Sequence, residues 1–172
     1  AQVGSLQVPA GVVRLRPARL RDGAQWSRLR LAERAELEPW EPGTEFDWTA
    51  RHAVSSWPAM YSGLRAEARR GRMLPYVIEL DGAFRGQLTI GNVTHGALRS
   101  AWIGYWVSRQ VTGGGVATGA LAARGVAVDL AALEPWEDPA VWKMIAGGGA
   151  RAVHHIELLV YWRHDVGDAS GG

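Results

Sequence analysis

The sequence predicts an α+β domain in which a mixed, mostly antiparallel sheet is flanked by helices. Three apolar segments, residues 75–80, 83–93 and 101–107, follow one another with only short turns between them, as in an antiparallel meander. Helical patterns precede the meander, and a triple-glycine turn followed by an Ala-rich stretch comes directly after it. With 172 residues, the chain is long enough for one domain with a substantial core.

The first part of the chain predicts one strand and two helices. Residues 12–16 alternate as in a strand, and a helix is expected over 24–37. Apolar residues recur at spacings of three and four over 50–68, which predicts a second helix with one apolar stripe. Pro58 should kink or split this helix, and Gly71 should end it.

The second part predicts the meander, a third helix and a late strand. Asp81 and Gly82 form a hairpin turn signal between the first two meander strands, and a second turn is expected around 95–96. Apolar residues keep helical spacing over 116–127, and residues 153–162 have the composition of a strand.

The domain organisation expected from these patterns is a single domain over 12–166. Residues 1–11 are expected to be a loose leader, and residues 124–150 are irregular, with prolines and glycines that exclude a regular helix interior. The polar, glycine-rich residues 167–172 are expected to be a disordered tail.

Composition excludes several classes of function. The chain has no cysteine, which excludes disulfides, thiolate catalysis and zinc–thiolate sites and fits a reducing cytoplasm. No apolar run approaches the roughly 20 residues of a membrane span, and the first residues lack the pattern of a signal peptide. The net charge is +2 and the basic residues are almost all arginine, without a run dense enough for nucleic acid. We therefore expect neither a nucleic-acid nor a membrane partner.

The triple-glycine turn at Gly113, Gly114 and Gly115 is the strongest motif. A glycine turn that opens a helix presents unpaired N–H groups and the positive end of the helix dipole, a combination that binds phosphate. No lysine follows the glycines, which excludes a Walker-type loop. Thr118 takes the place of the third glycine of a dinucleotide fingerprint, and the flanking strands are expected to be antiparallel. Both observations argue against a Rossmann dinucleotide site.

Four stretches carry a resemblance to a known family: Val13–Pro17, Leu37–Pro42, Trp102–Val107 and Gly113–Thr118. On these, the chain resembles the GCN5-related N-acetyltransferases (GNAT), and within them the RimJ/RimL-like branch that acetylates ribosomal-protein N-termini. The match spans residues 12–123. It implies a GNAT-like sheet with the glycine turn between the fourth strand and the third helix.

The resemblance implies a function and a cofactor site. The expected activity is transfer of acetyl from acetyl-CoA to a primary amine, most of all a protein N-terminal α-amine, by direct attack and without a metal. In the family, the fourth strand splays from the fifth and binds the pantetheine arm, which assigns Trp106, Val107 and Ser108 to that arm, with an N–H near Val107 polarising the thioester carbonyl. The expected pyrophosphate-binding residues are Thr112, Gly113, Gly114, Gly115, Val116, Ala117 and Thr118. Thr112 and Gly114 depart from the family, which has Gln or Arg at the first position and often Arg at the second.

Three residues are candidates for proton transfer. Glu41 lies in the loop that the resemblance places on the acceptor side, where it would act as a base or be a solvated loop carboxylate. Glu79 could reach the cleft through ordered water or form a surface pair, and Tyr161 could protonate the leaving thiol. His154 and His155 are adjacent on a strand and face opposite sides, so they predict no metal site.

Several alternatives stay open from the sequence. The acceptor could be a small-molecule amine such as an antibiotic or a polyamine, or the chain could be a non-catalytic acyl-CoA-binding module or a purely structural domain. A homodimer is also possible. Trp57 is expected in the core, whereas Trp40, Trp48 and Trp106 could line the acceptor cleft or belong to the core.

Overall fold

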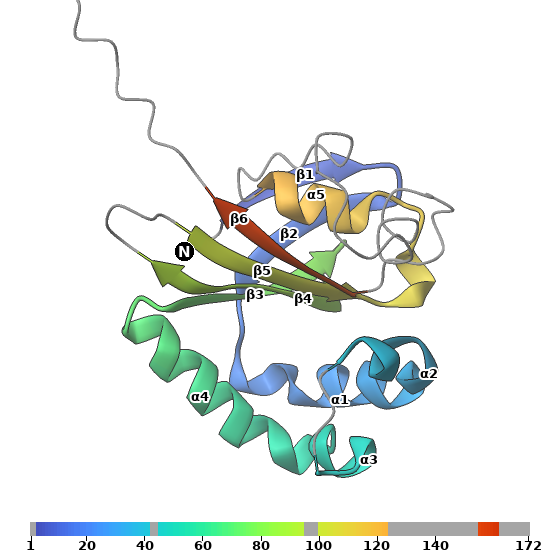
Figure 1. Cartoon of the computed structure of the whole chain (residues 1–172). Coiled ribbons are helices and arrows are strands. Elements are labelled where there is room, and N and C mark those ends of the chain that lie inside the picture. Colours follow the sequence, from blue (N-terminus) through green and yellow to red (C-terminus); the bar gives the residue numbers. More distant parts are fainter. Residues whose placement is uncertain (1–2, 42–44, 95–99, 124–154, 162–172) are drawn as a thin grey trace, which may run out of the picture.

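The structure, a computed structural model, describes residues 3–41, 45–94, 100–123 and 155–161 (Figure 1). Six strands form one sheet in the order β1-β2-β3-β4-β5-β6, so the order in the sheet follows the order in the chain. Every neighbouring pair among these strands is antiparallel. The strands are β1 Val3–Val8, β2 Gly11–Pro17, β3 Met73–Leu80, β4 Ala83–Thr94, β5 Ser100–Val107 and β6 His155–Tyr161.

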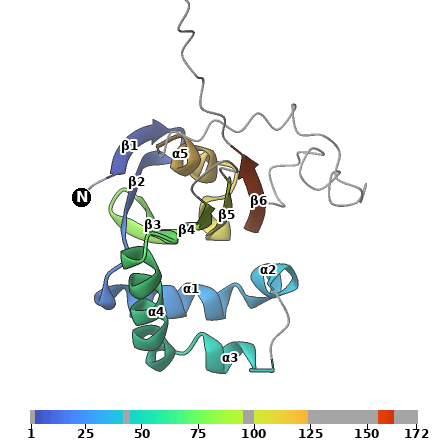
Figure 2. The same cartoon turned by 60° about the vertical axis from the view of Figure 1, so that its left-hand side comes forward.

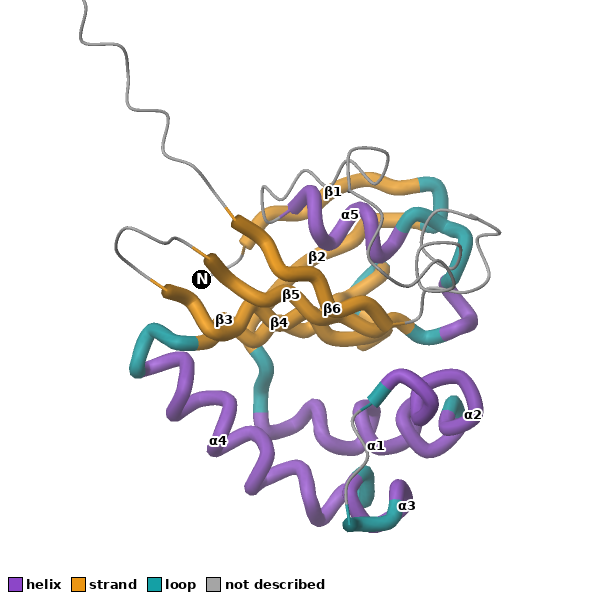
Figure 3. The backbone as a smooth tube through the Cα atoms, in the orientation of Figure 1, coloured by secondary structure: helices purple, strands orange, loops and turns teal. Residues whose placement is uncertain are grey.

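Helices cover both faces of the sheet. Helices α1–α4 lie on one face, and α5 lies on the other, beside β1 and β2 (Figures 1 and 2). Figure 3 shows the same layers by secondary structure, with the short connections between them. The α-helices are α1 Gly23–Ala32, α2 Arg34–Leu37, α3 Trp48–Arg51, α4 Trp57–Arg69 and α5 Val116–Ala123; the 3₁₀ turns are η1 Leu20–Asp22, η2 Glu38–Trp40, η3 Val54–Ser56 and η4 Arg109–Val111. The predicted α+β class is confirmed, with the described sheet antiparallel throughout.

The two predicted early helices are both interrupted. The helix expected over 24–37 changes direction at Glu33, whose φ of −109° and ψ of 28° are not helical. The helix expected over 50–68 splits into α3, η3 and α4, with Pro58 in the first turn of α4. Proline fits there because the first N–H groups of a helix have no partner within it. The prediction of a split at Pro58 is confirmed.

The expectation of a loose leader over 1–11 is wrong for Val3–Val8, which form β1. This strand pairs with β2 in one register from Val8↔Gly11 to Ser5↔Arg14, and the register shifts before Val3↔Leu15. Helix α5 packs on it so closely that a Cβ added at Gly119 would lie 2.6 Å from Val8 Cγ1. The missing signal is therefore tertiary, because the strand is held by β2 and by a helix more than 100 residues away in the sequence.

Alternation along the strands separates two cores. On the α5 face lie Val13, Leu15, Tyr76, Ile78, Leu80, Leu88, Ile103, Tyr105, Val107, Val116 and Ala120. On the α1–α4 face lie Trp26, Leu29, Leu37, Trp48, Trp57, Val77, Phe84 and Trp106. Val107 and Trp106 are neighbours in β5 and belong to different cores, as the period of two requires.

The late strand expected over 153–162 is found as β6, and it runs antiparallel to β5 from Ser100↔Tyr161 to Trp106↔His155. This pairing differs from the splayed arrangement that the resemblance implies, because β6 accompanies β5 along nearly its whole length. The predictions for 95–96, 124–150 and 167–172 lie outside the described residues. Within the described part of the chain, no helix has both the length and the apolar character needed to span a bilayer.

Candidate functional site

The glycine turn requires glycine for its backbone. Gly113 and Gly115 have φ of +80° and +78°, a left-handed conformation that side chains disfavour. The turn also packs on the tip of the β1–β2 hairpin, where Ala10 N donates to Gly114 O at 3.2 Å. A Cβ at Gly114 would lie 2.5 Å from Ala10 Cβ, so this close approach leaves no room for the arginine that the family often has here.

The start of α5 offers free donors beside this turn. The N–H of Gly119 is the first in the helix with an acceptor, Gly115 O at 2.8 Å. Within the described residues, no acceptor pairs with the N–H groups of Val116, Ala117 or Thr118. These are the donors that a helix N-terminus presents to an anion. The geometry therefore agrees with the predicted phosphate-binding role of this segment.

At the end of β5, one N–H group points away from β4, toward the side of β5 on which β6 lies. Ser108 N donates to Arg85 O of β4 at 2.7 Å. Because consecutive N–H groups of a strand point to opposite sides, the N–H of Val107 points away from β4. The register with β6 ends one residue earlier, at Trp106. Val107 thus has the orientation expected for a donor to a thioester carbonyl.

Two predicted cofactor residues use their hydroxyl groups within the protein. Ser108 is fully buried, and its Oγ donates to Glu33 Oε1 at 2.5 Å. The other oxygen of Glu33 accepts from Arg109 N at 3.0 Å. Thr112 Oγ1 donates to Arg109 O at 2.6 Å. Ser108 therefore joins the α1–α2 junction to the end of β5, and its predicted contact with the pantetheine arm stays a prediction.

Glu41 lies in a charged cluster rather than in a solvated loop. Arg30 Nη1 donates to Glu41 Oε1, and Arg51 Nη1 lies 3.8 Å from Glu41 Oε2. His52 Nε2 lies 4.0 Å from the same Oε2. Only 14% of the Glu41 side chain is exposed. The carboxylate is thus bound by Arg30 of α1, with Arg51 of α3 and His52 farther from its other oxygen.

Arg30 connects this cluster to the predicted cofactor strand. Its guanidinium carbon lies 4.4 Å from the ring centroid of Trp106 and 5.8 Å from that of Trp48. Trp48 Nε1 donates to Arg30 O at 2.9 Å, and Trp106 Nε1 donates to Gln87 Oε1 at 3.0 Å. Trp48 and Trp106 are nearly fully buried, so the structure places both in the core beside Arg30. The side chain of Trp40 lies outside the described residues.

His52 is buried beside this carboxylate with one nitrogen occupied. Its Nδ1 lies 2.9 Å from Trp48 O, and its ring packs on those of Trp48 and Trp26 at centroid distances of 4.0 and 5.4 Å. A carbonyl only accepts, so Nδ1 carries the proton of the neutral ring and Nε2 carries the lone pair. Burial is the main cause that lowers the pKa of His52, and the nearby cations Arg30 and Arg51 lower it further.

Glu79 lies in a different buried network. Arg16 Nε donates to Glu79 Oε1 at 2.5 Å. The two terminal nitrogens of Arg16, Nη1 and Nη2, each donate to one carboxylate oxygen of Asp22 at 2.8 Å. Hydrogen bonding to Asp22 is the largest cause that raises the pKa of Arg16. Of the two alternatives for Glu79, a pair is found, but it is buried rather than at the surface. The pairing favours an anchoring role for Glu79 between β3, β2 and η1.

The backbone of Tyr161 lies at the opposite end of β6 from the residue that pairs with Trp106. Its backbone pairs with Ser100, whereas Trp106 pairs with His155 at the opposite end of the same ladder. Six residues of strand separate the two positions, a distance of roughly 20 Å. The expected role of Tyr161 as the acid for the leaving thiol stays a prediction.

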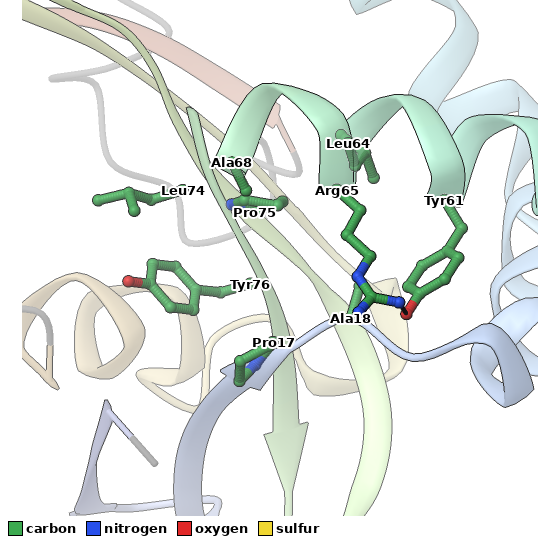
Figure 4. A pocket seen from close by; sticks show the side chains of 9 residues that line it. All are labelled: Pro17, Ala18, Tyr61, Leu64, Arg65, Ala68, Leu74, Pro75 and Tyr76. Carbon is green, nitrogen blue, oxygen red and sulfur yellow. Dashed lines mark hydrogen bonds between the residues drawn. The ribbon is translucent and has the colours of Figure 1, made fainter. Parts of the chain in front are cut away.

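A pocket of about 390 Å³ lies elsewhere, between α4 and the start of β3 (Figure 4). Figure 4 shows Arg65 extended beside Tyr61, whose hydroxyl accepts from Arg65 Nη1 at 3.4 Å. The lining residues are Pro17, Ala18, Tyr61, Leu64, Arg65, Ala68, Leu74, Pro75 and Tyr76. They include none of the predicted site residues. In the described part of the chain, no three His, Asp or Glu side chains are close enough to hold a metal ion.

Sequence reasoning missed Arg30, Glu33 and His52. One signal was present for the first two, since they share a stretch with the apolar Trp26, Leu29 and Leu37 at helical spacing. A charged residue on a buried stripe needs a partner, and the partners are Glu41 and Ser108. No local pattern marks His52.

Comparison with solved structures gives a similar protein at high identity. Mycobacterium smegmatis RimJ in complex with CoA-disulfide is 72% identical, with a TM-score of 0.70, over 72% of this chain. The chain spans 59% of the length of that protein. No family model matches the chain, and no curated protein does.

Two further structures share the fold at low identity. RimL, a ribosomal L7/L12 α-N-protein acetyltransferase in complex with coenzyme A, is 19% identical with a TM-score of 0.56, over 72% of this chain and 64% of RimL. The ribosomal-protein-S5-alanine acetyltransferase from Vibrio fischeri is 16% identical with a TM-score of 0.54, over 66% and 60% of the two chains. With the glycine turn, the antiparallel sheet and the likeness to RimJ, the chain belongs to the GCN5-related N-acetyltransferase family.

Proposed function

We propose that this protein is an N-acetyltransferase that moves the acetyl group of acetyl-CoA to a primary amine, most of all the α-amine at a protein N-terminus. The observation that carries the proposal is the 72% identity to RimJ, whose structure holds a CoA-disulfide. The backbone of Gly113 and Gly115 and the free donors of Val116 and Ala117 support a pyrophosphate site in this chain.

In the proposed reaction, the neutral amine attacks the thioester carbonyl carbon directly. A C–N bond forms, the C–S bond breaks, and the sulfur leaves as the thiolate of CoA. The amine then loses a proton to a base, and the thiolate gains one. The N–H of Val107 is proposed to polarise the carbonyl oxygen, and Glu41 is proposed as the base. Glu79 is less suited because its partner Arg16 binds it into a network with Asp22, whereas Arg30, the partner of Glu41, packs on Trp106 near the end of β5.

The charge around Glu41 bears on the acceptor. Arg30, Arg51 and Glu41 together leave one net positive charge, since His52 is held neutral by burial. A polyamine or an aminoglycoside carries several positive charges, which this cluster would repel. The cluster therefore favours a peptide N-terminus over these small-molecule acceptors.

Calorimetric titration with acetyl-CoA tests the cofactor site. Gly115→Glu forces a side chain into a left-handed position and places a carboxylate where the pyrophosphate is proposed. Gly71→Glu is the matched control, because Gly71 has a φ of +70° and open space around it, away from the glycine turn. We expect micromolar binding that the Gly115 variant loses and the Gly71 variant keeps. If the wild type did not bind acetyl-CoA, the result would contradict the enzyme proposal and favour a purely structural domain.

Turnover separates the enzyme from a non-catalytic binding module. Because the chain has no cysteine, a thiol reagent reports CoA release without a background from the protein. The acceptors compared are a peptide with a free N-terminal alanine, the same peptide acetylated, and spermidine. We expect release only with the free peptide. Binding without release for every amine would favour the acyl-CoA-binding module.

The lack of cysteine supports a cytoplasmic setting, and light scattering would test the homodimer that the sequence left open.

A further inference from the structure

We propose that Arg30 is a positioning residue for this reaction, which holds the Glu41 carboxylate at a fixed place relative to the end of β5. The inference rests on the proposed function, since it takes Glu41 as the base and the end of β5 as the place of the thioester. It adds a role for Arg30 of α1, a residue that does not contact the reacting atoms itself.

The contacts of Arg30 reach both parts of the proposed site. One end of its guanidinium binds Glu41 Oε1, and its plane lies over Trp106, 4.4 Å from the ring centroid. Trp106 is in turn fixed by Gln87, and it directly precedes Val107 in β5. A chain of contacts therefore runs from the carboxylate through Arg30 and Trp106 to Val107, whose N–H points away from β4.

Packing alone gives no reason for an arginine here. The side chain is 12% exposed, and its Nε is buried without a hydrogen-bond partner in the described structure. Burial lowers the pKa of Arg30, the sign of a cation held against a desolvation cost. An apolar side chain of similar length would fill the same space, and such replacements of buried charge are often neutral or stabilising when the partner is also neutralised. A role in placing Glu41 explains why a cation is kept.

The remaining contacts of Glu41 are too long to fix it. Arg51 and His52 approach its other oxygen only to 3.8 and 4.0 Å. Without Arg30, the carboxylate would lose the one short contact that the structure gives it. A displacement of about 1 Å at a reacting group costs on the order of 100-fold in rate.

Kinetics of variants test the role. Arg30→Met should lower kcat about 100-fold while the KM for acetyl-CoA changes by less than about twofold, because the cofactor donors are untouched. The double variant Arg30→Met/Glu41→Gln should be no slower than Glu41→Gln alone, since Arg30 acts through Glu41. Arg34→Met is the control, because Arg34 forms a comparable but half-exposed pair with Glu38.

Titration of His52 provides a readout that does not need turnover. The charged groups facing its ring are Arg30 from α1, Glu41 after η2 and Arg51 from α3. The nuclear magnetic resonance signal of His52, assigned with His52→Asn, reports whether the Glu41 carboxylate is near. Glu41→Gln should lower the pKa of His52 in the wild-type background and have no effect in the Arg30→Met background, where the carboxylate has already moved away.

The outcomes are distinct. The inference would be overturned if the losses of kcat caused by Arg30→Met and Glu41→Gln multiplied in the double variant. It would also be overturned if Glu41→Gln changed the pKa of His52 equally in the wild-type and Arg30→Met backgrounds. A wild type that transfers no acetyl would overturn the proposed function, whereas the titration still decides whether Arg30 holds Glu41. Should Arg30→Met fail to fold, Arg30→Lys keeps the charge and loses the planar fork, and the same coupling is expected from it.

Discussion

Loss of Arg16 should destabilise the fold strongly. Its side chain makes one charged hydrogen bond to Glu79 and two to Asp22. The side chain of Glu79 is 12% exposed and that of Asp22 is 4% exposed. Arg16→Met leaves both carboxylates buried without their cation. Asp22 keeps one donor, Arg19 N at 2.7 Å, so part of the cost is relieved. Breaking a buried pair in this way costs about 3–5 kcal/mol.

Urea unfolding followed by tryptophan fluorescence measures this free energy, and three of the nine tryptophans are fully buried near α1. A thermal scan should show the midpoint about 10 °C lower. Arg14→Met is the matched control, since Arg14 lies on the same strand and is exposed, and it should change stability by less than about 0.5 kcal/mol. The triple variant Arg16→Met/Asp22→Asn/Glu79→Gln should recover part of the loss because no buried charge remains. A loss below about 1 kcal/mol for Arg16→Met alone would refute the reasoning.

Three further predictions concern stability. Ser108→Ala removes the donor to the buried carboxylate of Glu33 and should cost about 1.5–3 kcal/mol in urea unfolding; a loss near zero would mean that water replaces the hydroxyl. Burial lowers the pKa of His52 below 6.5, so the unfolded chain binds a proton that the folded chain resists, and stability should fall as the pH drops below 6.5. His52→Phe should flatten that part of the pH profile of the unfolding free energy, and an unchanged slope would contradict the assignment. A Cβ at Gly86 would lie 2.0 Å from Trp106 O, so Gly86→Ala should push β4 from β5 and cost about 1–3 kcal/mol, whereas wild-type stability would show that the strands adjust freely.

The fold was largely predictable because its elements carry local signals. The hairpin at Asp81 and Gly82 has φ of +50° and +82°, as its Asp-Gly sequence predicts. The glycine turn likewise requires the positive φ found at Gly113 and Gly115. The strand β1 was missed although it forms a hairpin with β2, because the helix that packs on it, α5, lies more than 100 residues away in the sequence.

The site was less predictable than the fold. The segment at Gly113–Thr118 was recognisable because one stretch of sequence supplies its donors. Glu41 was recognised by its loop, but its contacts with Arg30 and His52 join separate helices, and no spacing in the sequence reveals them. For Tyr161, only the register of β6 on β5 decides at which end of the sheet its backbone lies.

By itself, the sequence determined the α+β class, the glycine turn before a helix and the resemblance to the acetyltransferase family. These depend on local backbone preferences and on residues that are adjacent in the chain. Tertiary structure alone decided which carboxylate is bound by which arginine: Glu79 is bound by Arg16, and Glu41 by Arg30. The physical reason is that burial and the charged partner determine what a carboxylate can do. The pairing of β2 with β3 sets both for Glu79, and the packing of α1 sets both for Glu41.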